Sequence, residues 1–383
     1  MFDKKGKSAS DRTQRIAALL SELAEAGLVG DRERLELLVL NAIRMLKDDC
    51  PDAAKQLTET LSRYSGSERG LRWRKVGPPP VDQEEGIALL RMENVADAPC
   101  PILPEDITTR VEQFIRERKD AHRLVSEGFA PPSSLLLKGP PGTGKTMLAR
   151  WLARQLDLAL VVQDLATSVS SFLGKTGYNL RRSLDYARSS PCLLLLDEFD
   201  AIAKRRDDTT DVGELKRIVN VLLKELENWP LHSVLIAATN HPDLLDPAIH
   251  RRFHVVLELP LPGLEERCKI MERASGRFSA AMPPKFLEVC ASVMDGVSGS
   301  DLDGLVQAGI RRHLVTDAPL QETTISELRR RYREQINGGN IGGLIRAFQR
   351  ASGGAFTVRQ LATMFGKSVS TVQHHLKRED IDA

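Results

Sequence analysis

Residues 139–146 have the sequence GPPGTGKT, and their types and spacing are suited to holding the phosphates of a nucleotide. The segment fits the pattern G-x-x-x-x-G-K-[ST], with an apolar run before it and a helical pattern after it. Glycines allow backbone amides to turn toward phosphate oxygens, and the start of the helix adds partial positive charge. We expect Lys145 to reach the β- and γ-phosphates and Thr146 to bind magnesium. The nucleotide-binding residues predicted in this way are Gly139, Pro140, Pro141, Gly142, Thr143, Gly144, Lys145, Thr146 and Met147.

A pair of carboxylates follows the apolar run CLLLL at residues 192–196. If this run is a central strand, Asp197 and Glu198 lie at its carboxyl end, beside the phosphate crevice of an α/β sheet. Asp197 is then expected to position magnesium, directly or through water, and Glu198 to polarise the attacking water. The competing interpretation is an acidic pair on the surface at a strand end.

Two further segments supply groups that act on a γ-phosphate. Asn240 follows the apolar run 234–238, and its amide is predicted to hydrogen-bond the attacking water or the γ-phosphate. Arg251 and Arg252 form a pair without a nearby acidic partner that would neutralise both. Because an arginine supplied across a subunit boundary stabilises a phosphoryl group during transfer, we predict this role for the pair. The alternative is a solvated pair on the surface.

The elements that must position these groups alternate along the chain. Short apolar runs lie at residues 135–137, 158–162, 192–196, 234–238 and 255–259, separated by helical patterns. Continuous apolar runs suit strands buried on both faces, and their alternation with helices predicts a parallel sheet covered on both sides. The predicted fold is therefore an α/β phosphate-loop sheet sandwiched by helices, followed by an all-α lid. A helical N-terminal module and a small helical C-terminal module flank it.

Changes in composition and pattern predict the boundaries of these parts. A linker is expected where Gly, Pro and charged residues dominate, and a second one at the sequence NGGNIGG. The predicted parts are a helical module at 1–64, a linker at 65–104, an α/β core at 105–262, a helical lid at 263–336, a Gly-rich linker at 337–343 and a helix-turn-helix-like module at 344–383.

The overall composition is that of an ordinary soluble chain. The 383 residues are 42% hydrophobic and carry a net charge of +2, which gives no global attraction to nucleic acid or membrane. No apolar run is long enough to span a bilayer, and the N-terminus has no signal-peptide core. Five scattered cysteines without a CxxC pair suggest neither a disulfide framework nor a zinc site. We expect a cytoplasmic location and no membrane partner.

Taken together, these segments resemble the AAA family of ATPases. The matching pieces, in the family's order, are GPPGTGKT, LLLLDEFDAI, AATN, LDPAIHRRF, PLPGLEER and GVSGSDLDGLVQAG, which cover about residues 130–315. The compressed IHRRF resembles the katanin, spastin and fidgetin-like group. The resemblance implies a single-tier ring, usually a hexamer, that binds ATP and Mg²⁺ at its subunit interfaces. The sequence departs from the family at Ser300, where alanine is common, and GSDLDG offers no lid arginine.

A loop that contacts protein substrates is predicted at Phe172-Leu173-Gly174. Family members that thread polypeptides carry an aromatic–apolar–Gly loop at the corresponding place. An aromatic side chain grips other side chains through apolar contact, and glycine lets the loop move. The alternative is that Phe172 packs within a helix.

The C-terminal segment TVRQLATMFGKSVSTVQHHLKRED has the spacing of a helix-turn-helix, with Ala362, Gly366 and Val372 at the packing and turn positions. Residues 311–383 contain twelve Lys and Arg against seven Asp and Glu. DNA binding through residues 357–378 and protein docking are both compatible with this segment. The expected exposed residues of its second helix are Ser368, Ser370, Thr371, Gln373, His374 and Lys377.

Three hypotheses of function follow. The leading one is an ATP-hydrolysing ring that remodels or threads a protein substrate for a separately encoded effector. The second is a DNA-associated ATPase, a regulator or loader, anchored by the C-terminal segment. The third is a nucleotide-switched scaffold, which the intact Glu198 opposes.

Overall fold

The computed structural model describes residues 19–24, 38–39, 42–43, 52–53, 55–57, 90–167, 176–203, 229–245, 247–331 and 341–377. The chain divides into two units, Met1–Gly77 and Pro78–Ala383. The described residues of the first unit have helical backbone. The second unit contains the sheet and all of the residues analysed below.

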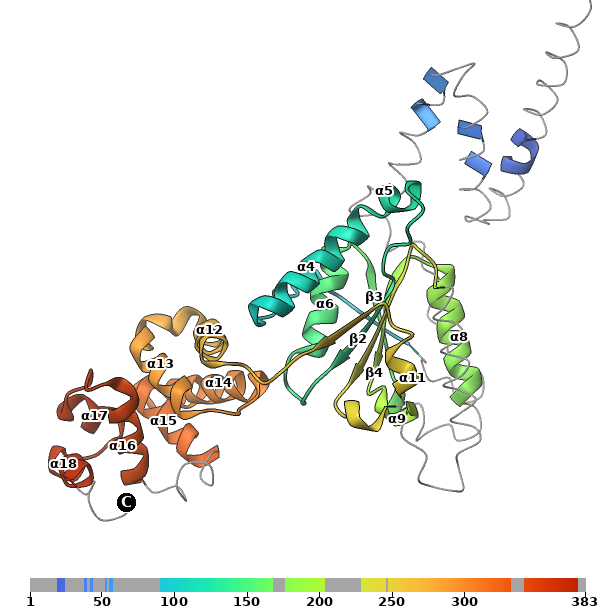
Figure 1. Ribbon diagram of the computed structural model, residues 1–383. Coiled ribbons are helices and arrows are strands. Elements are labelled where there is room, and N and C mark those ends of the chain that lie inside the picture. The colour runs from blue at the N-terminus through green and yellow to red at the C-terminus, as the bar shows by residue number, and fades with distance from the viewer. Residues whose placement is uncertain are drawn as a thin grey trace, which may run out of the picture. The chain divides into compact units, whose positions relative to one another are not determined.

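A six-stranded, mostly parallel sheet forms the centre of the second unit (Figure 1). The strands lie in the order β1-β3-β4-β5-β2-β6. Their bounds are Arg91–Glu93 for β1, Ser134–Lys138 for β2, Ala159–Asp164 for β3, Cys192–Asp197 for β4, Val234–Thr239 for β5 and Val255–Glu258 for β6. All pairs are parallel except that of β1 with β3. The central position of β4 and β5 explains why their sequences are almost wholly apolar.

Strand β1 lies within residues 65–104, which the sequence predicted to be a linker, so that prediction is wrong for this part. Arg91 pairs with Val162 and Glu93 with Leu160 in an antiparallel register at the edge of the sheet. The strand escaped prediction because its sequence, RME, is short and mostly charged. Glu93 anchors it, since its carboxylate accepts a hydrogen bond of 2.7 Å from Nε of Arg150 on the neighbouring helix.

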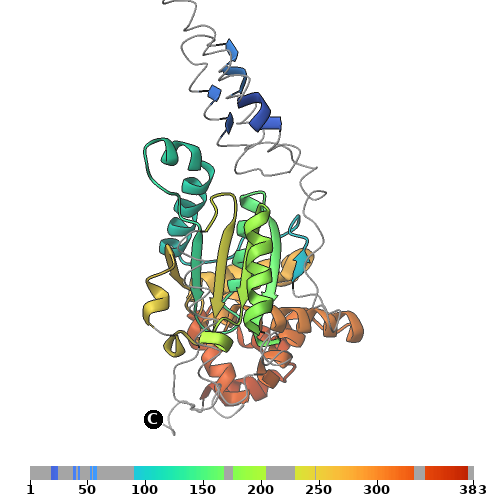
Figure 2. The same ribbon diagram turned by 90° about the vertical axis from the view of Figure 1, so that its right-hand side faces the viewer.

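Helices cover both faces of the sheet, as Figures 1 and 2 show, and alternate residues of the strands pack against them. Leu135 and Leu137 of β2 face a core shared with α4 (Glu105–Lys119) and α6 (Lys145–Gln155). Leu136 faces the opposite core, shared with α8 (Thr176–Ser189). The short helices α5 (Ala121–Ser126), α9 (Asp200–Ala203), η2 (Pro242–Leu244) and α11 (Pro247–His250) complete this part. The predicted α/β class is confirmed.

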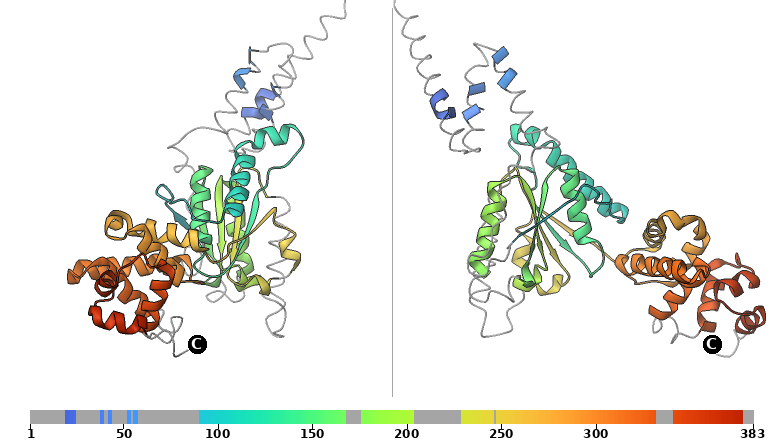
Figure 3. Two further views of the ribbon diagram at one scale, coloured as in Figure 1. Left: turned by 60° about the vertical axis from the view of Figure 1, so that its left-hand side comes forward. Right: turned by 180° about the vertical axis from the view of Figure 1, so that it is seen from behind.

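In the part of the chain that the structure describes, only helices follow β6, and they share one hydrophobic core (Figure 3). They are α12 (Leu264–Ser275), η3 (Gly276–Ala281), α13 (Pro284–Val293), α14 (Gly299–Thr316), α15 (Leu320–Arg331), α16 (Ile341–Ser352), α17 (Val358–Met364) and α18 (Val369–Lys377). This core includes residues from Ile270 of α12 to Val372 of α18. We refer to α12–α15 as the lid and to α16–α18 as the C-terminal helices.

The Gly-rich linker predicted at 337–343 is therefore too long at its C-terminal end. Helix α16 begins at Ile341, and Gly342 and Gly343 are buried within it. Glycines without side chains allow close approach of a neighbouring element, so their presence did not mark a flexible break here. The C-terminal helices also pack on the lid rather than around a core of their own.

No helix among the described residues is long and apolar enough to cross a membrane. The cysteines in these residues, Cys100, Cys192, Cys268 and Cys290, are free thiols. Burial raises the pKa of Cys192 to about 12 and also raises that of Cys290. Both are packing residues with little thiolate character.

Candidate nucleotide-binding site

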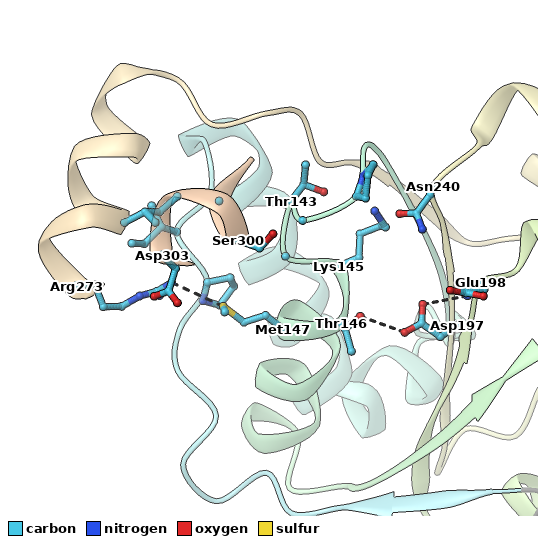
Figure 4. A pocket seen from close by; sticks show the side chains of 17 residues that line it. Thr143, Lys145, Thr146, Met147, Asp197, Glu198, Asn240, Arg273, Ser300 and Asp303 are labelled. Carbon is cyan, nitrogen blue, oxygen red and sulfur yellow. Dashed lines mark hydrogen bonds between the residues drawn. The ribbon is translucent and has the colours of Figure 1, made fainter. Parts of the chain in front are cut away.

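The loop after β2 opens onto a cavity of about 460 Å³ that the lid closes from the other side (Figure 4). This volume lies within the usual range of small-molecule sites. The lining residues are Pro101, Ile102, Pro141, Gly142, Thr143, Gly144, Lys145, Thr146, Met147, Asp197, Glu198, Asn240, Ile270, Arg273, Gly299, Ser300 and Asp303. Most of the residues predicted from GPPGTGKT therefore line one cavity with Asp197, Glu198 and Asn240. Gly139 and Pro140 do not line the cavity, but their carbonyl oxygens accept hydrogen bonds from Lys145.

The loop has the backbone geometry of a phosphate cradle. Gly144 precedes α6 with φ of 95°, and no side chain caps the first amides of that helix. A Cβ at Gly144 would meet no atom within 4 Å, so the space beside the loop at this residue is open. Free amides at a helix N-terminus are the usual binding groups for phosphate. The residues present therefore fit a nucleotide phosphate.

Lys145 lies at the floor of this cradle and is 7% exposed. Its Nζ donates hydrogen bonds of 2.8 Å to the carbonyl oxygens of both Gly139 and Pro140. Burial lowers the pKa of Lys145, and the carboxylates of Asp197 and Asp200 oppose that shift. A cation in this position compensates the charge of an anionic ligand bound at the loop.

Thr146 and Asp197 meet between α6 and the end of β4. The Thr146 hydroxyl donates a hydrogen bond of 3.1 Å to Oδ2 of Asp197. A hydroxyl and a carboxylate are oxygen ligands of the kind that Mg²⁺ prefers, and few protein ligands suffice because Mg²⁺ keeps several waters. The predicted metal-binding pair is thus adjacent in space, although it is separated by 51 positions in the chain.

Glu198 projects from the turn that ends β4. Its φ is 52°, in the left-handed region that side chains rarely occupy, and its backbone amide donates to Oδ1 of Asp197 at 3.0 Å. The side chain is exposed toward the cavity. Burial, followed by the nearby carboxylates of Asp164, Asp197 and Asp200, raises the pKa of Glu198. Strained backbone at a strand end marks a position whose side-chain direction matters.

Asp200 connects the end of β4 to the end of β5. Its Oδ1 accepts hydrogen bonds from the hydroxyl of Thr239 at 2.8 Å and from the amide of Asn240 at 3.3 Å. The amide of Phe199 donates to the carbonyl of Ala238 at 2.8 Å in the same region. These bonds fix Asn240 beside Glu198 at the cavity. Asp200 has no local signature in the sequence, because its contacts with Thr239 and Asn240 depend on the pairing of β4 with β5.

The lid side of the cavity contains residues that sequence reasoning missed. Arg273, from α12, lines the cavity and donates hydrogen bonds to the carbonyl of Cys100 at 2.7 Å and to Sδ of Met147 at 3.8 Å. An arginine of the lid thus lines the cavity, although it comes from α12 and not from the segment GSDLDG. Asp303 of α14 also lines the cavity (Figure 4). Pro101, Ile102 and Ile270 add apolar surface of the kind that packs against a nucleotide base.

The remaining predicted residues lie elsewhere. Arg251 and Arg252 are exposed, and neither is among the residues that line the cavity of their own chain. They follow α11, whose Ile249 packs with Phe253 in the core on the α8 face of the sheet. Phe172, Leu173 and Gly174 fall outside the described residues.

Comparison with known proteins assigns the segment that carries this site. Residues 135–261 match the model of the family described as ATPase family associated with various cellular activities (AAA). This segment is therefore similar to the ATPase domain of the AAA family. The match includes the phosphate loop, Asp197, Glu198, Asn240 and both arginines.

Curated relatives match the same region. An uncharacterized AAA family ATPase, y4kL, of Sinorhizobium fredii is 43% identical over 39% of this chain and 45% of its own length. A proteasome-activating nucleotidase of Aeropyrum pernix is 37% identical over 53% of this chain and 51% of its own length. One from Thermococcus onnurineus is 35% identical over 49% and 50%, respectively. The chain thus spans about half the length of the curated relatives it matches.

Proposed function

We propose that this chain hydrolyses ATP and uses the energy to remodel or thread a protein substrate. The observation that supports hydrolysis is the meeting of the phosphate loop, Asp197, Glu198 and Asn240 at one cavity. All four come from the carboxyl ends of neighbouring strands β2, β4 and β5, where ligands bind in open α/β sheets.

Each residue of the site has a role in this proposal. Lys145 and the loop amides bind the β- and γ-phosphates. Thr146 and Asp197 would hold Mg²⁺, which neutralises charge on the phosphates when bound. Glu198 accepts a proton from the attacking water, and Asn240 orients that water. This division follows the general logic of phosphoryl transfer, in which positioning and charge stabilisation carry most of the catalysis.

Assembly into a ring, with the hexamer as the expected size, explains the position of the arginine pair. Arg251 and Arg252 do not line their own cavity, but an exposed pair can complete the cavity of a neighbouring subunit. A group supplied across an interface makes hydrolysis depend on assembly. In such a ring, each cavity would receive Arg251 and Arg252 from the neighbouring subunit.

The protein substrate is supported by the names of relatives and by one sequence segment. Two of the relatives are called proteasome-activating nucleotidases. We propose by analogy that this chain delivers polypeptide to a separately encoded partner, such as a compartmentalised protease. Phe172-Leu173-Gly174 is the proposed substrate-gripping loop. The free cysteines of the described residues suit the reducing cytoplasm that we propose as its location.

Phe172→Ala tests threading separately from hydrolysis. We expect ATP turnover and assembly close to those of the unaltered protein, since a phenyl ring supplies no group that binds phosphate, Mg²⁺ or the attacking water. Unfolding of a tagged fluorescent protein should fall at least about tenfold, because an aromatic contact contributes on the order of 1 kcal/mol or more at each subunit.

The matched control is Tyr178→Ala, which removes an exposed aromatic side chain from nearby helix α8. It should leave both activities near normal. Threading is contradicted if Phe172→Ala unfolds the fluorescent protein as fast as the unaltered chain. Hydrolysis without any substrate unfolding by the unaltered chain would contradict remodelling while leaving the ATPase assignment intact.

A further inference from the structure

The C-terminal helices carry a basic, polar face that the nucleotide site does not use. Helix α17 begins at a capping box, in which the Thr357 hydroxyl accepts from the amide of Gln360 and the Gln360 side chain accepts from the amide of Thr357. After α17 the chain turns at Gly366, whose φ is 58°. Helix α18 then begins at Val369. Two short helices joined by a tight turn with a left-handed glycine have the form of a helix-turn-helix.

Packing determines which side of α18 faces outward. Val372 is fully buried, and Ala362 of α17 is 5% exposed. The carbonyl of His375 accepts a hydrogen bond of 3.2 Å from Arg346 of α16, which holds the inner side of α18. The opposite side carries exposed or partly exposed residues at the helical spacing i, i+3, i+4 and i+7. These residues are Ser370, Gln373, His374 and Lys377.

The charged residues of the C-terminal helices are all basic. Residues 341–377 contain five Lys and Arg, two His and no Asp or Glu. Arg350, Arg359, Lys367 and Lys377 are exposed. The acidic group that the structure brings to the turn is Glu322 of α15, whose carboxylate lies beside Gly366. A face of exposed cations without acidic partners on its own helices attracts a polyanion.

We propose that α18 enters the major groove of duplex DNA, with Lys367, Arg359 and Lys377 on the flanking phosphates. A helix fits the major groove, and hydroxyl, amide and lysine side chains are the types that contact base edges there. An acidic protein would satisfy the cations equally well. The hydroxyl, amide and imidazole groups of Ser370, Gln373 and His374 lie beside these cations, as base edges lie beside phosphates in a major groove. Duplex DNA is therefore the occupant that matches both the charged and the neutral residues.

The proposal goes beyond remodelling, and it links DNA to the ATPase through shared packing. The core that buries Val372 of α18 also contains Ile270 of α12, which lines the nucleotide cavity. The DNA-binding face is therefore built onto the lid itself. A DNA duplex held there is expected to recruit the ring without occupying the cavity.

Fluorescence anisotropy with the full chain and a short labelled duplex of random sequence tests this inference. We expect saturable binding at about 50 mM salt that weakens steeply by about 200 mM, since counterions are released from the phosphates. Lys367→Ala/Lys377→Ala should reduce the slope of log K against log salt by about 0.9 for each phosphate that the variant no longer neutralises. Gln373→Ala removes no charge and should leave this slope unchanged.

The control is Lys269→Ala/Lys285→Ala, which removes the same charge from an exposed position on α12 and a partly exposed one on α13. It should leave the slope and affinity unchanged, and all variants should retain ATP turnover. The proposal is overturned if both double variants bind equally, if the unaltered chain does not bind duplex, or if poly-glutamate displaces the duplex at equal charge. The last result would identify an acidic protein as the occupant.

Discussion

At the scale of single residues, Lys145 and Glu198 separate binding from hydrolysis. Lys145→Ala should abolish ATP binding, because the nearly buried ammonium is the cation of the phosphate loop. Glu198→Gln should bind ATP but turn it over at least about a hundredfold more slowly, because an amide cannot accept the proton from water. Calorimetric titration and phosphate release measure the two effects. Normal affinity in Lys145→Ala, or normal turnover in Glu198→Gln, would remove that residue from its proposed role.

Gly142 connects the phosphate loop to the lid. Its carbonyl accepts a hydrogen bond of 3.1 Å from the amide of Ser300. A Cβ at Gly142 would lie 2.4 Å from the hydroxyl of Ser300 and 3.0 Å from Cβ of Ser298, at a φ of 75°. The serine hydroxyls can rotate away, but Cβ of Ser298 cannot move without shifting α14.

Gly142→Ala should therefore weaken ATP binding about tenfold or more, which corresponds to about 1.4 kcal/mol. The control is Gly128→Ala, which has a φ of 86° and no atom within 4 Å of the added Cβ. It imposes similar backbone strain away from the cavity, so it should lower thermal stability without changing affinity. Equal affinity of the two variants for ATP would show that the loop does not need contact with the lid.

The sequence predicted the cavity residues that belong to a local motif, and it missed those that reach the cavity only through packing. Lys145 and Thr146 follow from eight consecutive letters, and Asp197 and Glu198 follow from a strand that ends in two carboxylates. Arg273 has no such signature, because it reaches the cavity only through the position of α12. The number of residues between Arg273 and the phosphate loop does not predict that the two share a cavity, because the folded lid brings them together.

At the scale of elements, the segment between β5 and β6 carries the arginine pair to the surface. We expect Arg251→Ala/Arg252→Ala subunits and Lys145→Ala subunits each to be inactive alone. In mixed rings, some interfaces pair an intact phosphate loop with intact arginines, so partial ATP turnover should return. The pair acts within its own chain, or only in folding, if co-assembly is demonstrated and turnover stays absent.

Elements with strong patterns were predicted well, and those with weak patterns were not. Strands β4 and β5 are almost wholly apolar, and so is the middle of β2, because both faces of these strands are covered, and the sequence shows this directly. Strand β1 is held at the sheet edge by its pairing with β3 and by Glu93 with Arg150, both distant in sequence. The start of α16 at Ile341 was obscured by its own glycines.

At the scale of the whole molecule, the lid and the C-terminal helices act as one folded body rather than two. Phe348 of α16 is fully buried and lies between the two groups. Its ring centroid is 6.4 Å from that of Phe286 in α13 and 5.3 Å from that of Phe365, which follows α17. Boundaries predicted from a run of glycines could not reveal this, because a shared core is a property of packing and not of composition.

Phe348→Ala should therefore destabilise α13 and α17 together, and α14 through the core that it shares with them, by about 3–5 kcal/mol as for other buried Phe→Ala changes. Because Gly299 and Ser300 at the start of α14 line the nucleotide cavity, ATP affinity should fall as well. Phe278→Ala, which removes a half-buried ring at the edge of the same core, should cost much less. Native-state hydrogen exchange measures protection in these helices. If α17 became unprotected while α14 kept its protection, the C-terminal helices would be an independent domain, as their sequence alone had predicted.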